Sequence, residues 1–535
     1  MLAHLFVKCW MIVSTLACSK IYFRIDEHFT LATINPLSPS VTVPSAILFR
    51  QRWIDYINNP KLVTLIKALG PMYARVGGTQ ADFVRYVPDQ NTNIEEKLKS
   101  TIAPTCNPHP RDQRRFDAHG KWVEREMTAR QTLNQDKKRI VRNITFSSTD
   151  WVNLNEFCKC VGWKLIFGLN LLQRKGLAWD PSNAEKLLKY TEKRRYKVDW
   201  ELGNESNYYN AHPPWGITLT PEEVGSAFLR LRELLEASKW LKSSLVVGPD
   251  MNQLGSDVSA RFLNRFLQTA GGAIDRITVH QYDFGAPNAT LYDFLSPRNM
   301  NKIIAQITWV KRFVNRYVPN TPIWLGETSS AFGGGVKGFS DSFLDGFTWI
   351  DKLGTTARLG VDLVIRQSIF AQGYSLIDKN FDPLPDFWLT LLYRRIVGHQ
   401  VLNLHLQECN FTHCRILKNE DVRMYAHCAK RSLYMQGNVV VYFVNVRPNP
   451  VRIAIVSHHK TKHRNELYLF QPSIPGNLTS KEVLLNGKVL RLSSTLSIPP
   501  LLPIRLSHGA LVDGLNIPGY SYGFLVLKTR FTACL

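Results

Sequence analysis

The sequence predicts an α/β fold, a (β/α)8 barrel with a C-terminal β-sandwich domain, from three observations. Short apolar runs bounded by turn residues recur between about residues 40 and 370 and alternate with amphipathic segments, as in a (β/α)8 barrel. After about residue 395 the runs lie between Pro, Gly and Asn clusters, which is typical of a β-sandwich. A chain of 535 residues is also too long for one ordinary core and favours a large domain plus a smaller one.

Seven apolar runs are the expected barrel strands: Tyr73–Val76, Lys164–Leu169, Val198–Leu202, Leu245–Val247, Ile277–Val279, Ile323–Leu325 and Leu363–Ile365. The clearest helix begins at Thr220, which forms a capping box with Glu223 around Pro221 at the first helical position. An apolar stripe follows at helical spacing and should face the barrel, formed by Phe228, Leu231 and Leu235. The expected sandwich strands are Val439–Val444, Arg452–Val456 and Tyr522–Val526.

Residues 1–19 have the pattern of a secretory signal. Lys8 precedes the apolar run Cys9–Cys18, and a small residue, Ser19, follows. The run is too short to span a bilayer comfortably, and no later stretch approaches about 18 uninterrupted apolar residues. We therefore expect a lumenal or extracellular protein without a transmembrane segment.

The chain is strongly basic, with a formal net charge of +23 and a pI near 9.6. Such a charge indicates a polyanionic partner, for which nucleic acid, an anionic membrane and a sulfated glycan are the candidates. Export from the cytoplasm argues against nucleic acid.

Two carboxylates, Glu205 and Glu327, carry the clearest chemical signal. Each follows a predicted barrel strand, and barrel active sites lie at the carboxyl ends of the strands. Two carboxylates at that face can cleave a glycosidic bond, because one protonates the leaving oxygen while the other attacks the anomeric carbon. Asn204 adds a polar group suited to a sugar hydroxyl, and His280 and Tyr282, which follow another strand, could orient Glu327 or contact the sugar.

Seven cysteines remain once Cys9 and Cys18 leave with the signal, and export makes disulfides expected. Their spacing fits no zinc site, and we expect neither a metal ion nor a cofactor. Proximity suggests that Cys409 pairs with Cys414. Glycosylation sequons begin at Asn143, Asn288, Asn410 and Asn477. Asn204 also begins one, but we discount it because it should lie in the cleft.

Several motifs together resemble the heparanases, a family of endo-β-glucuronidases that act on heparan sulfate. They are RVGGTQADF (75–83), KLIFGLN (164–170), WELGNE (200–205), WLGETSSAFGGG (324–335), DKNFDPLPDFW (378–388) and the final TACL. The likeness runs from about residue 35 to the end and is weakest between about 90 and 140. It implies a retaining enzyme in which Glu205 is the acid/base and Glu327 the nucleophile, with carboxyl groups about 5–5.5 Å apart.

The resemblance also implies which residues contact the sugar. Gly373, Tyr374 and Thr79 match binding positions, and Gln253 matches another. The glycines after Phe332 expose backbone N–H groups that suit an anion such as a uronate carboxylate, and they include Gly333 and Gly334. Arg139 and Arg142 approximate a basic motif that contacts heparan sulfate. The implied disulfides are Cys106 with Cys160 and Cys428 with Cys534, which leaves Cys158 unpaired.

Residues 91–138 are polar, charged and proline-bearing, and a stretch of this kind within a compact domain is usually functional or disordered. In the heparanases this region is excised by a protease, which leaves a light and a heavy chain. The expected divisions are a light-chain part (20–90) with one sandwich strand and the first barrel strands, the linker (91–138), the rest of the barrel (139–395) and the sandwich (396–535). The alternative is that 91–138 is a passive surface insertion.

Three departures from the family pattern bear on specificity. Ser206 replaces the proline after the acid, Pro44 falls where an Asp contacts substrate, and Gly255 falls where an Arg would bind sulfate. The leading interpretation is a secreted or lysosomal hydrolase of heparan sulfate or similar heparin-like polyanions in the extracellular matrix. Two alternatives are a glucuronidase of another glycan, such as hyaluronan or arabinogalactan, and an inactive heparan-binding homologue. The intact stretch around Glu327 argues against the second, since the inactive branch lacks the nucleophile.

Overall fold

The computed structural model describes residues 20–45, 56–89, 144–211, 217–370, 372–410, 413–418, 420–456 and 464–535. The expected signal (1–19) and linker (91–138) lie outside these ranges, as do Cys106, Arg139, Arg142 and Asn143. Within the described ranges, no helix has the length and apolar character needed to cross a membrane.

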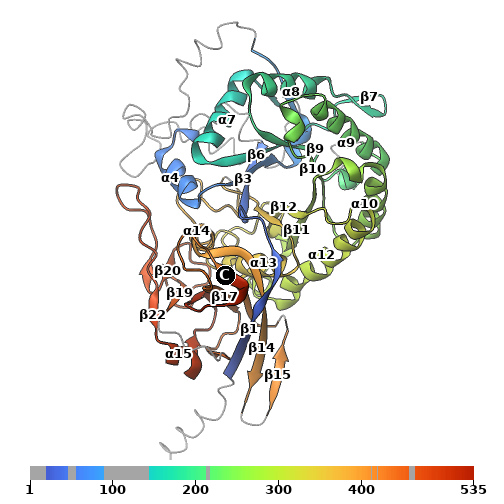
Figure 1. Ribbon diagram of the computed structural model, residues 1–535. Helices are drawn as coiled ribbons and strands as arrows, with labels where there is room; N and C mark the ends of the chain where they lie inside the picture. The colour runs from blue at the N-terminus through green and yellow to red at the C-terminus, as the bar shows by residue number, and fades with distance from the viewer. Residues whose placement is uncertain are drawn as a thin grey trace, which may run out of the picture.

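Eight parallel strands form the barrel (Figure 1). They are β2 (Ser40–Pro44), β3 (Met72–Gly77), β6 (Trp163–Leu169), β9 (Val198–Leu202), β10 (Val247–Met251), β11 (Arg276–Gly285), β12 (Ile323–Phe332) and β13 (Leu363–Arg366). The hydrogen-bonded order runs from β10 through β13 to β2 and on to β9, and a parallel bridge between Trp200 and Val246 closes the ring. Each strand therefore lies beside the next one in the chain, and the predicted barrel is confirmed.

A helix follows each strand and covers the outside of the barrel (Figure 1). These helices are α4 (Pro60–Leu69), α7 (Ser148–Val161), α8 (Ser182–Arg194), α9 (Pro221–Glu236), α10 (Asp257–Ala270), α12 (Pro297–Tyr317), α13 (Asp345–Arg358) and α14 (Pro385–Ile396). The start of α9 is as predicted: the Thr220 side chain accepts from the N–H of Glu223, a capping box forms, and Pro221 is the first helical residue. Its predicted apolar stripe is buried.

The seven expected barrel runs all overlap strands. β10 begins at Val247, the last residue of its expected run, and continues to Met251, and β11 and β12 extend furthest beyond the predicted ends. β11 continues to Gly285 and β12 to Phe332, because the polar residues that end the apolar runs, such as His280 and Thr328, stay buried within the strands. The first barrel strand, β2, has five residues, and the apolar pattern of the sequence did not predict it.

The second domain is built on a sheet of twelve strands. β1 (Lys20–Thr33) pairs antiparallel with β14 (Val397–Cys409) and parallel with β18 (Val451–Ile455), so the start of the described chain lies within the C-terminal domain, as the resemblance implies. The remaining strands are β15 (Cys414–Leu417), β16 (Val422–Ala429), β17 (Val439–Asn445), β19 (Asn465–Pro472), β20 (Val483–Leu485), β21 (Lys488–Val489), β22 (Ile504–Leu506), β23 (Leu515–Ile517) and β24 (Ser521–Leu527).

Alternation along the central strands separates two cores. On β17, Val441 and Phe443 belong to the sandwich core with Phe23, whereas Tyr442 belongs to the large core that includes the barrel. Helix α13 packs closely against this second face, since a Cβ added at Gly354 would lie 2.2 Å from the ring of Tyr425. The sandwich domain is thereby fixed to the barrel by direct packing.

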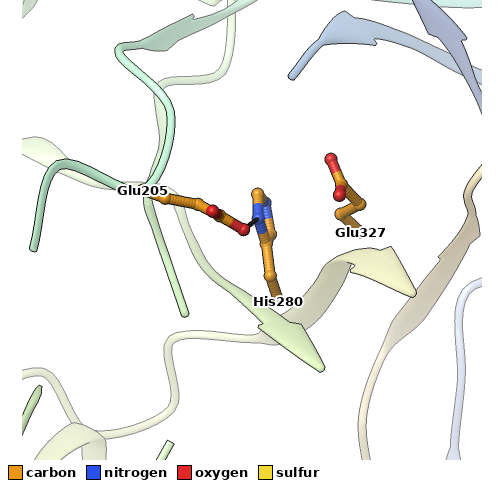
Figure 2. Close-up of side chains that lie close together, drawn as sticks. All are labelled: Glu205, His280 and Glu327. Carbon is orange, nitrogen blue, oxygen red and sulfur yellow. Dashed lines mark hydrogen bonds and ion pairs between the residues drawn. The ribbon is translucent and has the colours of Figure 1, made fainter. Parts of the chain in front are cut away.

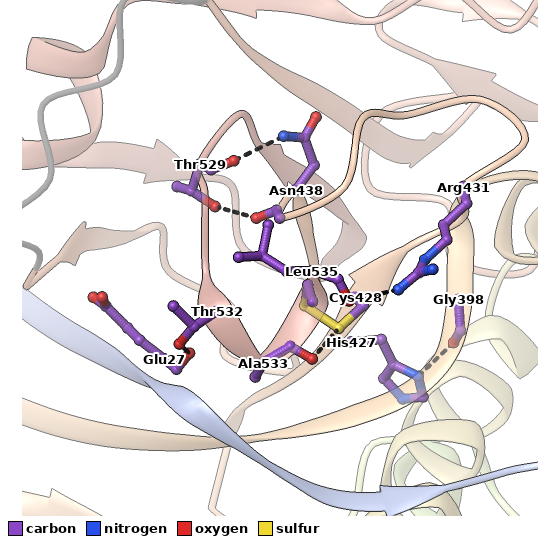
Figure 3. Close-up of a disulfide and its surroundings, with 12 residues drawn as sticks. Glu27, Gly398, His427, Cys428, Arg431, Asn438, Thr529, Thr532, Ala533 and Leu535 are labelled. Carbon is purple, nitrogen blue, oxygen red and sulfur yellow. Dashed lines mark hydrogen bonds between the residues drawn. A yellow bond between two sulfur atoms is a disulfide. The ribbon is translucent and has the colours of Figure 1, made fainter.

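Two of the expected disulfides are present. Cys428 of β16 bonds to Cys534 near the chain end, as Figure 3 shows, and Cys409 bonds to Cys414 across the β14–β15 hairpin. Cys158 is unpaired and buried, as expected. Cys160 is disulfide-bonded, but its expected partner lies outside the described residues, so that pairing stays a prediction.

Candidate active site

Glu205 lies on the loop that follows β9, the fourth strand of the barrel. Its backbone has φ 54°, a left-handed conformation that is uncommon for a residue other than glycine. The Glu205 N–H donates to the carbonyl of Asp250 at 2.9 Å, which ties the loop to the end of β10. The hydrogen bond holds the Glu205 backbone in this uncommon conformation and so fixes the direction of the side chain. Backbone conformations of this kind are common at functional sites.

Glu327 lies within β12, the seventh strand, directly opposite His280 on β11. Its carboxylate accepts two hydrogen bonds, from the Tyr282 hydroxyl at 2.6 Å and from Nη1 of Arg75 at 3.0 Å. Burial, reinforced by the Glu327 carboxylate, raises the pKa of Tyr282 well above its usual value. Tyr282 therefore keeps the proton that it donates.

The two carboxylates are close together, with His280 beside both (Figure 2). One oxygen of Glu205 lies within 4.8 Å of one oxygen of Glu327. Glu205 Oε1 lies 2.8 Å from Nδ1 of His280, and Glu205 Oε2 accepts from Nδ2 of Asn252 at 2.8 Å. Both carboxylate oxygens of Glu205 are therefore in contact with neighbouring side chains.

A buried arginine, Arg75 of β3, organises the floor of the site. Its guanidinium contacts Glu201 Oε2 at 2.8 Å, and Asn204 Oδ1 and Asp250 Oδ2 at 3.1 Å each, besides Glu327. The next glycine makes room for it, since a Cβ at Gly77 would lie 2.7 Å from Cζ of Arg75. We did not predict this residue. The signal that could have indicated it was a charged residue inside an otherwise apolar strand.

Glu201 and Asp250, which share Arg75, differ in their protonation. Burial raises the pKa of Glu201 well above its usual value, and the neighbouring Asp250 carboxylate raises it further, although Arg75 acts in the opposite direction. Burial also opposes ionisation of Asp250, but Arg75 and His280 outweigh it and hold its pKa below the usual value. The surroundings therefore favour the neutral form of Glu201 and the ionised form of Asp250 beside Arg75.

His280 lies among three carboxylates. Burial alone would lower its pKa, but the Glu327 carboxylate and hydrogen bonding to Asp250 and Glu205 raise it to about 10. Nε2 of His280 lies 3.4 Å from Oδ1 of Asp250, on the side opposite Glu205. The imidazole is thus a buried cation that faces both predicted catalytic residues.

Asp82 supports the loop that carries Glu205. It accepts from the Tyr209 hydroxyl at 2.7 Å and from the Asn204 N–H at 3.2 Å. Burial raises the pKa of Asp82 to about 7, against the effect of these two donors. Nothing in the sequence pattern distinguished this residue from an ordinary surface Asp.

The other predicted sugar contacts lie at the same end of the barrel. The ring of Tyr374 lies 6.1 Å from that of Tyr282, and the N–H of Gly373 donates to the carbonyl of Gly334 at 3.1 Å. Gly333 and Gly334 have positive φ, which only glycine adopts readily, and Phe332 is 56% exposed beside them. Thr79 begins η1 (Thr79–Phe83), a short 3-10 helix that follows β3, and Gln253 lies on the loop that follows β10.

The sequon at Asn204 is buried, consistent with its exclusion as a glycosylation site. Asn288, Asn410 and Asn477 are exposed, so each is accessible to modification, which itself stays a prediction.

Several known proteins are similar to this chain in sequence. Residues 129–354 match glycosyl hydrolase family 79, N-terminal domain. The chain is 34% identical over 522 residues to heparanase of Bos taurus, covering 95% of this chain and 92% of that protein. It is 31% identical to hyaluronoglucuronidase of Hirudo nipponia, covering 89% and 92%. It is 30% identical to inactive heparanase-2 of Homo sapiens, covering 93% and 86%.

Solved structures share the fold at much lower identity. A 4-O-α-L-rhamnosyl-β-D-glucuronidase from Fusarium oxysporum has a TM-score of 0.62 at 13% identity, covering 94% of this chain and 99% of that one. The GH51 arabinofuranosidase from Xanthomonas axonopodis pv. citri has a TM-score of 0.60 at 12% identity, covering 95% and 100%. With the family match and an identity of 34% across nearly the whole chain, this protein belongs to glycosyl hydrolase family 79, together with the heparanases, and is a glycoside hydrolase.

Proposed function

We propose that this protein is a retaining endo-β-glucuronidase that cleaves heparan sulfate. The observation that carries the proposal is the separation of Glu205 and Glu327, whose nearest oxygens lie within 4.8 Å. Retaining glycosidases place their carboxyl groups about 5–5.5 Å apart, whereas inverting enzymes need about 6.5–9.5 Å to admit a water. The gap here favours direct attack by one carboxylate.

In the first step Glu327 attacks the anomeric carbon while Glu205 gives its proton to the leaving oxygen. The C–O bond to the leaving sugar breaks as the glycosyl ester forms on Glu327. Arg75 and Tyr282 hold the attacking carboxylate in position through the hydrogen bonds at 3.0 and 2.6 Å. In the second step Glu205 takes a proton from water, whose oxygen attacks the anomeric carbon and releases Glu327.

Three features support a sulfated uronic acid polymer as the substrate. The relatives include heparanases, the net charge of +23 attracts polyanions, and the loop at Gly333–Gly335 offers backbone N–H groups where a uronate carboxylate could bind. Arg139 and Arg142 are proposed to contact sulfate groups near the cleft.

Hyaluronan is the second candidate substrate, because the hyaluronoglucuronidase of Hirudo nipponia is 31% identical. An inactive binding role is disfavoured, since Glu327 is present and held by two donors.

We further propose export to the extracellular matrix or lysosome, and activation by a protease that removes residues 91–138. Strand pairing supports the expectation that the light and heavy chains stay associated after this cleavage. β2 and β3 lie before the linker, and β3 pairs with β6, which lies after it. β1 also pairs with β14 and β18, so the light chain would be held in both domains.

The experiment is size analysis of heparan sulfate and of hyaluronan after incubation with the chain cut on both sides of 91–138. Shortening of heparan sulfate alone is expected, and Glu327→Gln should abolish it. Shortening of hyaluronan alone would assign the second substrate. Full activity of an uncut chain would contradict the activation step but not the chemistry.

A further inference from the structure

A buried lysine, Lys352, lies behind the strand that carries Glu327. It belongs to α13, on the outside of the barrel, and is only 3% exposed. Its ammonium group contacts three oxygens: Asp283 Oδ2 at 3.2 Å, Thr328 Oγ1 at 3.0 Å and the carbonyl of Ser329 at 2.7 Å. These acceptors match in number the three N–H groups that a lysine ammonium can donate.

The three acceptors link β11 to β12. Asp283 belongs to β11, whereas Thr328 and Ser329 belong to β12. The Thr328 hydroxyl also donates to the carbonyl of Gln281 on β11 at 2.5 Å. Lys352 and Thr328 therefore fasten the two strands to each other on the outer face of the barrel.

The same two strands carry the proposed nucleophile and its donor on their inner face. Successive residues of a strand point to opposite faces, so Glu327 points away from Thr328 and Tyr282 away from Asp283. On the inner face, the Tyr282 hydroxyl donates to Oε1 of Glu327 at 2.6 Å. Each outer residue that Lys352 holds is thus the chain neighbour of one member of the Tyr282–Glu327 pair.

Strand pairing alone does not fix the direction of Glu327. The register between β11 and β12 shifts just before this residue, where β12 carries one extra residue, Gly326. An extra residue of this kind interrupts the ladder of hydrogen bonds and re-aims a neighbouring side chain. The contacts of Lys352 begin at Thr328, directly after the interruption and the nucleophile.

Helix α13 is a firm support for Lys352, because it is buried between the barrel and the sandwich domain. Asp351, the preceding residue, accepts hydrogen bonds from Arg423 and from the Tyr425 hydroxyl, both on β16 of the sandwich. Arg423 also donates to Oδ1 of Asn301 on α12 at 2.9 Å. The helix cannot shift without breaking these contacts, so the Lys352 ammonium approaches β11 and β12 from a fixed backbone.

We infer that Lys352 positions the nucleophile from outside the barrel, by holding β11 and β12 in the register that places the Tyr282 hydroxyl against Glu327. The inference rests on the proposed function, which makes Glu327 the nucleophile. Lys352 acts through Thr328 and Asp283 and is a positioning residue. A misplacement of about 1 Å in a reacting group can cost 10²-fold in rate, so such a contact matters for catalysis.

The test compares Lys352→Met with Arg394→Met. Methionine keeps much of the lysine side chain without the ammonium, and burial already raises the pKa of Asp283, so that carboxyl can take a proton in the variant. Arg394 is likewise a buried cation on a barrel helix that donates to backbone carbonyls. Its acceptors include Pro39 and Leu69, which lie before β2 and β3 at the opposite end of the barrel.

The two variants should differ in kcat for an aryl β-glucuronide. Lys352→Met should lower kcat by roughly 10- to 100-fold with KM unchanged within about twofold, because a displaced nucleophile slows the reaction while the contacts to the sugar remain. Arg394→Met should leave kcat within about twofold. Thermal unfolding of both variants gives the temperature range in which each is folded, and the rates are measured within it.

A double-variant cycle with Tyr282→Phe separates positioning from a merely structural role. The substitution removes the hydroxyl that Lys352 holds in place, so in its presence Lys352→Met should lower kcat by less than about threefold. The effect of Arg394→Met should be the same in both backgrounds. Thr328→Val gives the same cycle if Lys352→Met does not fold. It removes one acceptor of Lys352 without changing a charge, and its loss should be smaller but equally dependent on Tyr282.

Equal losses of kcat in Lys352→Met and Arg394→Met would overturn the inference. So would losses that multiply independently with that of Tyr282→Phe, since Lys352 would then act elsewhere than on the Tyr282–Glu327 pair. If the unaltered enzyme does not cleave the aryl β-glucuronide, the proposed function has failed instead, and the same comparison is made with an aryl glycoside that it does cleave.

Discussion

Nδ1 of His280 lies 2.8 Å from Oε1 of Glu205, so the proposed acid is paired with a buried imidazole whose pKa is raised to about 10. Other charged groups face the same ring: Asp250 from β10, Glu327 from β12 and Arg75 from β3. When Glu327 becomes an ester, one negative charge disappears and the His280 cation remains. That cation lies beside Glu205, which must take a proton from water in the second step.

Replacing His280 with Gln should therefore slow the second step more than the first. The expected loss in kcat is roughly 10²-fold, within the usual contribution of acid–base catalysis. Stopped-flow measurement with an aryl β-glucuronide should show a burst of aryl alcohol that is larger than in the unaltered enzyme, as the ester accumulates.

Asn252→Ala removes the other hydrogen bond to Glu205 without removing a charge and is the matched control. An equal burst in both variants would show that His280 only positions Glu205.

Arg75→Met should destabilise the fold by about 3–5 kcal/mol, because it removes the buried guanidinium that pairs with both Asp250 and Glu327. Glu201→Gln should cost less than about 1 kcal/mol, since burial already favours the neutral form of Glu201 and the amide can keep the contact with Arg75. Denaturant unfolding of the two variants measures the difference. Similar costs would mean that Glu201 is ionised in the folded protein.

Asp82 should make the protein less stable as the pH rises from about 4 to 7. Its pKa is raised from 3.8 to about 7 in the folded state, so between these values the folded protein binds more protons than the unfolded chain. The stabilisation from the protonated form is complete below the unfolded value and is lost as the pH rises through the folded one.

Asp82→Asn should flatten that part of the profile of unfolding free energy against pH, because the amide does not titrate. An unchanged slope between pH 4 and 7 in the variant would assign the dependence to other groups.

The two disulfides described should contribute very differently to stability. Cys428–Cys534 spans 106 residues, whereas Cys409–Cys414 spans 5. Since a disulfide acts mainly by restricting the unfolded chain, replacing the first pair with Ser should cost about 2–5 kcal/mol, and the second pair much less. Guanidinium unfolding of the two double Ser variants provides the comparison, and equal costs would contradict this account.

The sequence located the strands and the two carboxylates because both follow from local patterns. An apolar run followed by a polar residue marks the carboxyl end of a barrel strand, and Glu205 and Glu327 occupy such positions. Cys409 and Cys414 could be paired by proximity alone. The capping box at Thr220 likewise required only neighbouring residues.

The buried network around Arg75 could not be derived in this way. The residues of this network lie up to 175 positions apart in the chain: Arg75, Asp82, Glu201 and Asp250. Which of their charges are neutralised depends on which side chains meet once the strands form the barrel. A charged residue inside an apolar run signals a buried partner without identifying it. The full lengths of β11 and β12 were missed for the same reason, because burial of their polar residues is a tertiary effect.

The most direct test of the two-glutamate mechanism is covalent trapping with a 2-deoxy-2-fluoro β-glucuronide that carries a good leaving group. The fluorine slows the second step, so the ester should accumulate and be found by mass spectrometry of peptides. The account predicts one adduct, on the peptide that contains Glu327, and none in Glu327→Gln. An adduct on Glu205, or turnover without any adduct together with an inverted first product, would contradict it.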